Sequence, residues 1–193
     1  MGSEQGADFY DNRLERVLIP YEESPWKRIY DRVVDVLIRL CDHPKILDIG
    51  CGTGRLAEAI RRAGIRDYEG IDFSGERIKE ARRYVPSMKF DIVDVFAEGA
   101  EERFRRYDTF IMTEFLEHIT KDLDVIQQIP SGSRVIISVP NFDSAGHVRY
   151  FESEDEVIDR YSEYLHMAAE DTTEIRAPKR PEKITWVSHG IRR

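Results

Sequence analysis

The spacing of apolar residues changes several times along the chain, and each change predicts a new helix or strand. Ser24 and Pro25 form a pair typical of a helix start, and apolar residues recur at helical spacing from Trp26 to Leu40. Short apolar runs predict strands at 46–49, 68–73, 89–95, 109–113 and 134–139. Helical spacing between these runs predicts helices at 55–63, 74–84 and 122–129, with Ser74 as a cap. Such alternation indicates an α/β fold with a parallel sheet covered by helices on both faces.

The rhythm changes beyond Asn141. Residues 152–165 have a helical pattern with four apolar residues on one side, namely Val157, Ile158, Tyr161 and Leu165. Residues 173–177 and 183–191 predict a final pair of strands, joined by a turn that contains Pro178 and Pro181. No repeat or low-complexity linker divides the chain, so one domain is expected over 1–193. Within it we distinguish an N-terminal part (1–43), a central part (44–141) and a C-terminal part (142–193).

Composition and charge narrow the classes of partner. Of the 193 residues, 41% are hydrophobic and 34% are charged, which suits one soluble domain with a core. The net charge of −8 argues against a surface built mainly to neutralise nucleic-acid phosphates. Two cysteines and the absence of a CxxC pattern predict neither a disulfide framework nor a zinc site. No apolar run is long enough for a membrane helix, so a reducing cytoplasm and no membrane partner are expected.

Three glycines separated by single residues follow the first predicted strand: Gly50, Gly52 and Gly54. Glycine permits a tight turn and lets the backbone approach a ligand closely. In an open α/β sheet, ligands bind at the carboxyl ends of the strands. The spacing differs from the G-x-G-x-x-G of dinucleotide sites, and Asp48 would repel a pyrophosphate. The turn therefore favours a cationic or amine-bearing ligand over the cofactor of a dehydrogenase.

Two further acids end the next two predicted strands. Asp72 closes the second strand, where a carboxylate can accept hydrogen bonds from both hydroxyls of a ribose. Asp94 closes the third, where it can accept a hydrogen bond from the amino group of an adenine. Each acid alone suits an ordinary turn or cap. In order on successive strands after the glycine turn, they predict a site for a nucleoside-containing ligand.

At this point the sequence resembles the class I S-adenosylmethionine-dependent methyltransferases. The resemblance covers about 45–141 and rests on L-D-I-G-C-G-T-G-R, G-I-D-F-S, Asp94, E-F-L-E-H-I and I-I-S-V-P-N. It implies a Rossmann-like, seven-stranded, mostly parallel sheet with a C-terminal antiparallel hairpin. It also implies S-adenosylmethionine as cofactor, with methionine over the glycine turn, ribose on Asp72, and adenine between Phe73 and Val95. The cofactor-binding residues implied in this way are Asp48, Gly50, Cys51, Gly52, Gly54, Asp72, Phe73, Asp94, Val95 and Glu114.

The segment after the fourth predicted strand reads T-E-F-L-E-H. A helical turn would bring Glu114 and Glu117 to one face with His118 beside them, and His147 follows the fifth strand. Two carboxylates and two imidazoles form a ligand set for Mg²⁺ or Mn²⁺, so the candidate metal ligands are Glu114, Glu117, His118 and His147. The same E-x-x-E-H resembles ubiquinone-biosynthesis O-methyltransferases and small-RNA 3′-terminal 2′-O-methyltransferases. Many members of the wider family carry E-H here without a metal, which leaves an acid–base, orienting or structural role open.

The ends of the chain are expected to select the acceptor. The resemblance implies that an N-terminal segment, 9–26, and the insert at 142–165 cover the site. The opening residues M-G-S-E-Q-G are expected to form a flexible end. Arg149 in the insert is a candidate ligand for an acceptor carboxylate or phosphate.

The function expected is O-methylation of a small-molecule acceptor, with His118, Glu114 and His147 as catalytic candidates. Because the chain is acidic, RNA is the weaker alternative as acceptor. A second alternative is a methyltransferase-like module that binds the cofactor or a protein partner without transferring a methyl group.

Overall fold

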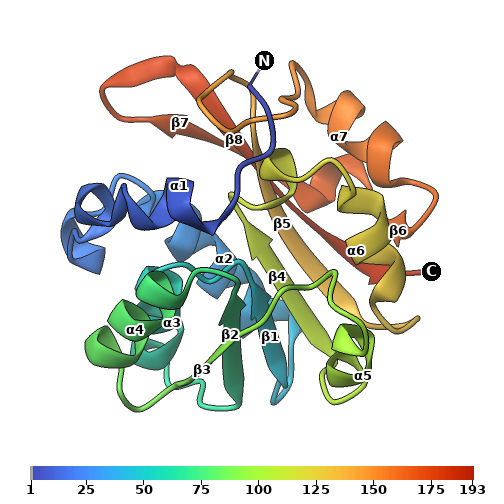
Figure 1. Cartoon of the computed structure of the whole chain (residues 1–193). Coiled ribbons are helices and arrows are strands. Elements are labelled where there is room, and N and C mark those ends of the chain that lie inside the picture. The colour runs from blue at the N-terminus through green and yellow to red at the C-terminus, as the bar shows by residue number, and fades with distance from the viewer. Residues whose placement is uncertain (1) are drawn as a thin grey trace.

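The protein is described by a computed structural model that covers residues 2–193, apart from the side chain of Arg16. Met1, the first residue of the expected domain, lies outside these described residues. Figure 1 shows one central sheet with helices on both sides and the N-terminal segment lying across one end of it. Among residues 2–193, no helix combines the length and the apolar character needed to cross a bilayer.

The strands of the sheet follow the order β3-β2-β1-β4-β5-β8, with β6 and β7 both pairing with β8. The first five strands run parallel, and β8 runs antiparallel to β5. Their bounds are β1 (Ile46–Ile49), β2 (Tyr68–Asp72), β3 (Lys89–Ile92), β4 (Thr109–Thr113), β5 (Arg134–Pro140), β6 (Leu165–His166), β7 (Thr172–Ala177) and β8 (Arg180–Arg192). The chain order reverses between β1 and β4, so the carboxyl ends of these two strands form the switch point at which α/β sheets bind ligands.

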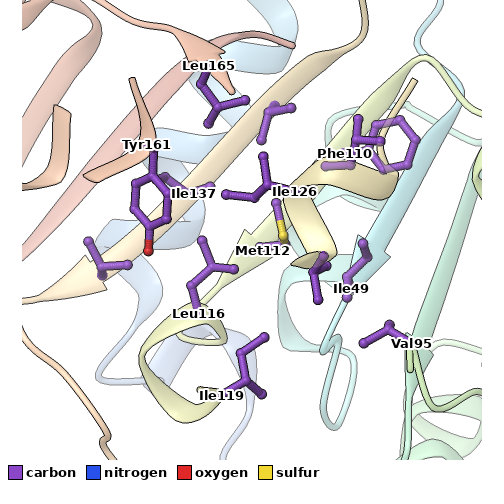
Figure 2. Packing of buried hydrophobic residues seen from close by; sticks show 14 of the residues in the cluster. Ile49, Val95, Phe110, Met112, Leu116, Ile119, Ile126, Ile137, Tyr161 and Leu165 are labelled. Atoms are coloured by element: carbon purple, nitrogen blue, oxygen red, sulfur yellow. The ribbon is translucent and has the colours of Figure 1, made fainter. Parts of the chain in front are cut away.

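Two hydrophobic clusters cover the two faces of the sheet. Ile46, Ile111 and Ile136 point to one face, where they pack with α2 (Lys27–Leu40), α3 (Arg55–Arg62) and α4 (Gly75–Tyr84). Leu47, Met112 and Ile137 point to the other face, with α5 (Ala100–Phe104), α6 (Asp122–Gln128) and α7 (Glu154–Tyr161). In Figure 2, Leu116 lies beside Met112, so the segment after β4 is anchored in this second cluster. The alternation along the strands explains why they are buried on both faces.

The short elements lie in the N-terminal part and in the loops. They are α1 (Ala7–Asp11) and the 3₁₀ turns η1 (Leu14–Val17), η2 (Tyr21–Glu23), η3 (Leu116–His118) and η4 (Ala169–Asp171). Residues 2–5, expected as a flexible end, instead contact the rest of the molecule. The Gly2 N–H donates to the His147 carbonyl at 2.9 Å, and a Glu4 carboxylate oxygen accepts from the Thr120 backbone N–H at 2.8 Å.

The expected α/β class, the parallel core and the antiparallel C-terminal hairpin are confirmed. Ser74 caps α4 as predicted, because its hydroxyl accepts from the Arg77 N–H at 3.1 Å. Two expectations need correction. The helix predicted over 152–165 ends at Tyr161, because Leu165 and His166 pair with β8 as an additional short strand. Ser24 does not cap α2, which begins at Lys27, since its hydroxyl accepts instead from the Trp26 N–H at 3.2 Å.

Candidate active site

A cavity of about 700 Å³ lies at the carboxyl ends of β1, β2 and β4. Most of the residues predicted for the site line it: Gly50, Cys51, Gly52, Asp72, Phe73, Asp94, Val95, Glu114, His118 and His147. Asp48, Gly54 and Glu117 are not part of the lining. The sheet therefore brings together side chains that are up to about one hundred residues apart in the sequence.

The glycine turn has the left-handed backbone that its residue types predict. Gly50, Gly52 and Gly54 have φ values of 75°, 54° and 79°. A Cβ on Gly50 would lie 2.5 Å from the Phe115 ring, whereas one on Gly52 would meet only the end of the Arg77 side chain, at 3.7 Å. Gly52 thus gives a ligand close access to the backbone, while Gly50 makes room for the segment after β4.

The two strand-end aspartates have different surroundings. Asp72 accepts hydrogen bonds from the Gly52 N–H at 3.0 Å and the Ser74 N–H at 2.9 Å, which orient its carboxylate at the cavity. Burial raises the pKa of Asp72. Asp48 is fully buried beneath the turn and accepts from the Tyr68 hydroxyl at 2.7 Å, while its other oxygen has no hydrogen-bond partner. Burial raises the pKa of Asp48 to about 7.

At the place predicted for adenine, Asp94 and Phe73 are accessible. Asp94 is exposed and accepts from the Phe96 N–H at 2.9 Å through one carboxylate oxygen, which leaves the second oxygen for a ligand. Phe73 is 40% exposed, and Val95 is buried. Both side chains line the cavity, and an aromatic ring together with an aliphatic side chain can pack against a planar base.

Glu114 and Glu117 do not share a helical face, contrary to the prediction. Glu114 has a left-handed backbone with φ of 50°, so it is not part of a helical turn. η3 begins only at Leu116. The Ser138 hydroxyl donates to its carboxylate at 3.2 Å. Burial raises the pKa of Glu114 to about 7. Of the four candidate metal ligands, Glu114 is the one that the tertiary structure separates from the rest.

The other three candidates converge. Ligand atoms of Glu117, His118 and His147 all lie within 4.8 Å of one another. The two imidazole rings lie at 78° to each other with centroids 4.8 Å apart. Glu117 is completely buried, and neither of its carboxylate oxygens has a hydrogen-bond partner among the described residues. Burial and the nearby Glu114 carboxylate raise the pKa of Glu117 well above its usual range.

The backbone fixes the orientation of both imidazoles. Nδ1 of His118 lies 3.1 Å from the Gly146 carbonyl, and Nδ1 of His147 lies 3.1 Å from the Phe142 carbonyl. A carbonyl only accepts, so each Nδ1 carries the hydrogen and each Nε2 keeps its lone pair. Burial lowers the pKa of His118 to about 4, and it also lowers the pKa of His147. Both rings are therefore neutral at pH 7.

This donor set fits a divalent cation. Histidines that bind metals usually donate their other ring N–H to a carbonyl or carboxylate, as both do here. A cation would also provide the partner that the buried Glu117 carboxylate lacks. The three side chains that would hold it are Glu117, His118 and His147.

The N-terminal part covers the cavity, as expected, and supplies residues that the sequence did not single out. The Tyr10 ring packs edge-on against Phe73 and His118, with centroids 5.6 and 5.9 Å apart, and the Arg77 guanidinium lies 4.7 Å from it. Tyr10 thus links the place predicted for adenine to the histidines. Burial raises the pKa of Tyr10 to about 12. Arg77 lies in the first turn of α4, the helix that Ser74 caps directly after β2, and this position was the available signal for its place in the lining.

Arg149 does not face the cavity as a free acceptor ligand. Its guanidinium donates to the backbone carbonyls of Leu116, Ile119 and Thr120 and also pairs with Asp122. The expectation that Arg149 binds a carboxylate or phosphate is therefore wrong, because its donors are used within the protein.

Comparison with known proteins identifies similar chains. The family model described as "Methyltransferase domain" matches residues 21–187. A ubiquinone biosynthesis O-methyltransferase of Aliivibrio fischeri is 36% identical over 104 residues, which are 50% of this chain and 44% of that protein. One of Erwinia tasmaniensis is 28% identical over 151 residues, which are 74% of this chain and 59% of that protein. The chain thus spans about half the length of these curated relatives.

Solved structures have the same fold at low sequence identity. The N-methyltransferase NodS of Bradyrhizobium japonicum, in complex with S-adenosyl-L-homocysteine, superposes with a TM-score of 0.68 at 17% identity, over 95% of this chain and 98% of that one. The magnesium protoporphyrin IX methyltransferase of Synechocystis, also with bound S-adenosylhomocysteine, gives 0.66 at 18% identity, over 88% and 84%. The methyltransferase domain of bacterial CtHen1-C gives 0.65 at 17%, over 87% and 98%.

Proposed function

The chain belongs to the methyltransferase domain family, and we propose that it transfers a methyl group from S-adenosylmethionine to an oxygen atom of a small-molecule acceptor. One observation carries the proposal. A single cavity is lined both by the glycine turn, Asp72 and Asp94 and by the two histidines of the Glu117–His118–His147 cluster. The first group suits the cofactor, and the second suits an acidic hydroxyl.

In this proposal, the cofactor lies along the carboxyl ends of β1 to β3. The Gly52 backbone and Asp72 bind the methionine and ribose parts, and Phe73 and Val95 enclose the adenine with Asp94 at its amino group. Asp48 and Gly54 act from outside the cavity. Asp48 lies beneath the turn, and Gly54 allows α4 to pack closely, since a Cβ there would lie 3.2 Å from Ala81.

The sulfonium methyl is already activated, so the chain has to align the acceptor and remove its proton. His118 is the candidate for the second task because it lines the cavity and its Nδ1 donates to the Gly146 carbonyl, which leaves the Nε2 lone pair free to accept a proton. If Glu117, His118 and His147 instead hold Mg²⁺ or Mn²⁺, the cation would lower the pKa of an acceptor hydroxyl. Tyr10 and the rest of the cover exclude water in either arrangement.

The curated relatives and the enclosed cavity favour a small acceptor such as a catechol. An RNA 3′ end is the alternative, since its ribose diol also suits a cluster of one carboxylate and two imidazoles. The net charge of −8 and the N-terminal cover argue against RNA. Filter binding of a short RNA across a range of salt concentrations tests this alternative, and absence of affinity at low salt removes it.

Calorimetric titration with S-adenosylhomocysteine, with and without Mg²⁺ or Mn²⁺ and with chelator, is the first test. We expect micromolar binding and, in a second assay with methyl-labelled S-adenosylmethionine, transfer of the label to a catechol. If cofactor binding and methyl transfer persist in chelator, His118 is the group that removes the acceptor proton. If transfer is lost in chelator, a divalent cation is needed to lower the pKa of the acceptor hydroxyl. Absence of cofactor binding would refute the proposal, and binding without transfer to any acceptor would favour a non-catalytic module.

A further inference from the structure

Arg149 connects two chain segments that each supply part of the cluster. It lies two residues after His147, and its side chain reaches the carbonyls around η3, which carries Glu117 and His118. One terminal nitrogen donates to the carbonyls of Leu116 and of Ile119, the latter at 2.6 Å, and the other donates to Thr120 at 3.1 Å. The side chain is 15% exposed and is absent from the cavity lining, so it cannot touch cofactor or acceptor directly.

Asp122 is the counter-ion of Arg149. Its carboxylate is 1% exposed and lies 3.2 Å from a terminal nitrogen of Arg149. Arg160 donates to it through two nitrogens, at 2.8 and 2.7 Å, and the Tyr161 hydroxyl donates at 3.1 Å. Asp122 thus satisfies the charge of Arg149 while the guanidinium bonds to neutral carbonyls.

The turn that Arg149 holds has little support of its own. η3 is a three-residue 3₁₀ turn without a side-chain cap, and such turns have poorer hydrogen-bond geometry than an α-helix. The Glu117 carbonyl is taken by the Val148 N–H at 2.8 Å. Val148 and Arg149 therefore bind the segment 116–120 by four described hydrogen bonds to its backbone carbonyls. Arg149 donates three of them.

We propose that Arg149, with Asp122 as its counter-ion, is a positioning residue that holds Glu117 and His118 against His147; the inference rests on the function proposed for this cluster. Arginine suits the task because its planar fork donates in several fixed directions, whereas a lysine ammonium is a point charge that cannot span the same carbonyls. Arg149 acts through the backbone and sets the separation of the three side chains.

Arg149→Lys and Arg160→Lys form a matched pair for the test. Both keep the positive charge beside Asp122, but Arg160 hydrogen-bonds Asp122 and makes no described hydrogen bond to a carbonyl of residues 116–120. For Arg149→Lys we expect S-adenosylhomocysteine affinity within about twofold of wild type and an unchanged KM for cofactor. Mn²⁺ affinity, measured by electron paramagnetic resonance, and kcat should both fall about 10- to 100-fold, the range found when groups supporting metal ligands are removed. Arg160→Lys should leave both near wild type.

Equal Mn²⁺ affinity and equal kcat in the two variants, measured below both melting temperatures, would overturn the proposal. If Arg149→Lys does not fold, Asp122→Asn replaces it, because the amide removes the counter-charge of Arg149 and keeps one of the two acceptor oxygens. Wild-type protein that binds no Mn²⁺ and transfers no methyl would refute the proposed function instead. In that case the positioning role is tested by the nuclear Overhauser effect between ring protons of His118 and His147. We expect this effect in Arg160→Lys and not in Arg149→Lys. Retention of the effect in Arg149→Lys would refute the positioning role.

Discussion

At the scale of single residues, the aspartates of the neighbouring strands β1 and β2 differ in what their carboxylates contact. Asp72 faces the cavity and is oriented by two backbone N–H groups. Asp48 faces the helices on one side of the sheet, where one oxygen bonds to Tyr68 and the other has no partner. Asp72 is therefore available to a ligand in the cavity, whereas Asp48 affects stability in a way that depends on pH.

Asp72→Ala should weaken binding of S-adenosylhomocysteine. Loss of hydrogen bonds between a carboxylate and two ribose hydroxyls should cost about 1.5–3 kcal/mol, or roughly 10- to 150-fold in Kd by calorimetry. Asp67→Ala, which removes an exposed carboxylate just before β2, is the control and should leave Kd unchanged. A change below twofold for Asp72→Ala would show that Asp72 is not the ribose ligand.

Asp48 should make the protein less stable as the pH rises from about 4 to about 7. The ordinary pKa of an aspartate is 3.8, and the pKa of Asp48 in the folded protein is about 7. The folded state therefore binds this proton more tightly than the unfolded state. The stability that this proton contributes is complete below pH 4 and is lost as pH rises through the folded pKa. Between pH 5 and pH 8 the loss is about 2–3 kcal/mol, at about 1.4 kcal/mol per pH unit.

Urea unfolding at pH 5 and pH 8 measures this contribution. Asp48→Asn cannot titrate, so its stability should change less between the two pH values than that of wild type, by about 2–3 kcal/mol. Other acids with raised pKa values, such as Glu114, titrate in both proteins and cancel in the difference. Identical pH dependence in wild type and variant would contradict the assignment.

At the scale of elements, the turn between β1 and α3 combines backbone conformation with close packing. Gly50 and Gly64 both have positive φ, at 75° and 88°. A Cβ on Gly50 would overlap the Phe115 ring, whereas a Cβ on Gly64 would meet nothing within 4 Å. Substitution of these two glycines therefore separates backbone strain from steric overlap.

Gly64→Ala should lower the free energy of unfolding by about 1 kcal/mol, the cost of left-handed backbone in an alanine. Gly50→Ala should cost at least about 2 kcal/mol more, because Phe115 must move, and it should also weaken cofactor binding. Chemical denaturation and calorimetry check the two effects. Equal destabilisation by both substitutions would show that the contact with Phe115 is not limiting.

At the scale of the whole molecule, the site is complete only when the N-terminal part lies across the sheet, as Figure 1 shows. Several of residues 2–13 line the cavity, among them Glu4, Phe9 and Tyr10. Glu4 accepts from the backbone N–H and the hydroxyl of Thr120, at 2.8 and 2.6 Å, and Tyr10 contacts Phe73 at the place predicted for adenine. An acceptor must therefore enter past this segment or displace it.

Glu4→Ala should weaken the attachment of residues 2–13, which cover the cavity, without affecting the hydrophobic core. Loss of the two hydrogen bonds to Thr120, which are partly screened because Glu4 is exposed, should cost about 1 kcal/mol and speed hydrogen exchange of the Thr120 amide about fivefold. Glu15→Ala, an exposed glutamate in η1 outside the cavity lining, is the control. Unchanged exchange at Thr120 would show that Glu4 does not hold the cover closed.

Local patterns were sufficient for much of the fold and for half of the site. Strand and helix positions, the Ser74 cap and the glycine turn follow from side-chain periodicity and from the backbone preferences of single residues. The places of Asp72 and Asp94 follow as well, because parallel strands bring their carboxyl ends to one edge of the sheet. Each of these features depends on residues close together in the chain.

Long-range contacts decided the rest. Glu114 leaves the cluster because its backbone turns left-handed and Ser138 of β5 binds its carboxylate. Leu165 joins the sheet through β8, and residues 2–5 are ordered by Thr120 and His147. Arg149 was predicted to bind a carboxylate or phosphate of the acceptor. Its guanidinium instead donates to backbone carbonyls about thirty residues earlier in the chain.

The sequence by itself therefore determined the layered sheet, the glycine turn and the acids at its edge, because short-range periodicity and turn chemistry specify them. The tertiary structure alone decided which of Glu114, Glu117, His118 and His147 meet and what holds them together. The physical reason is that a buried polar group must find a partner wherever the fold provides one, and no local pattern in the chain encodes that partner.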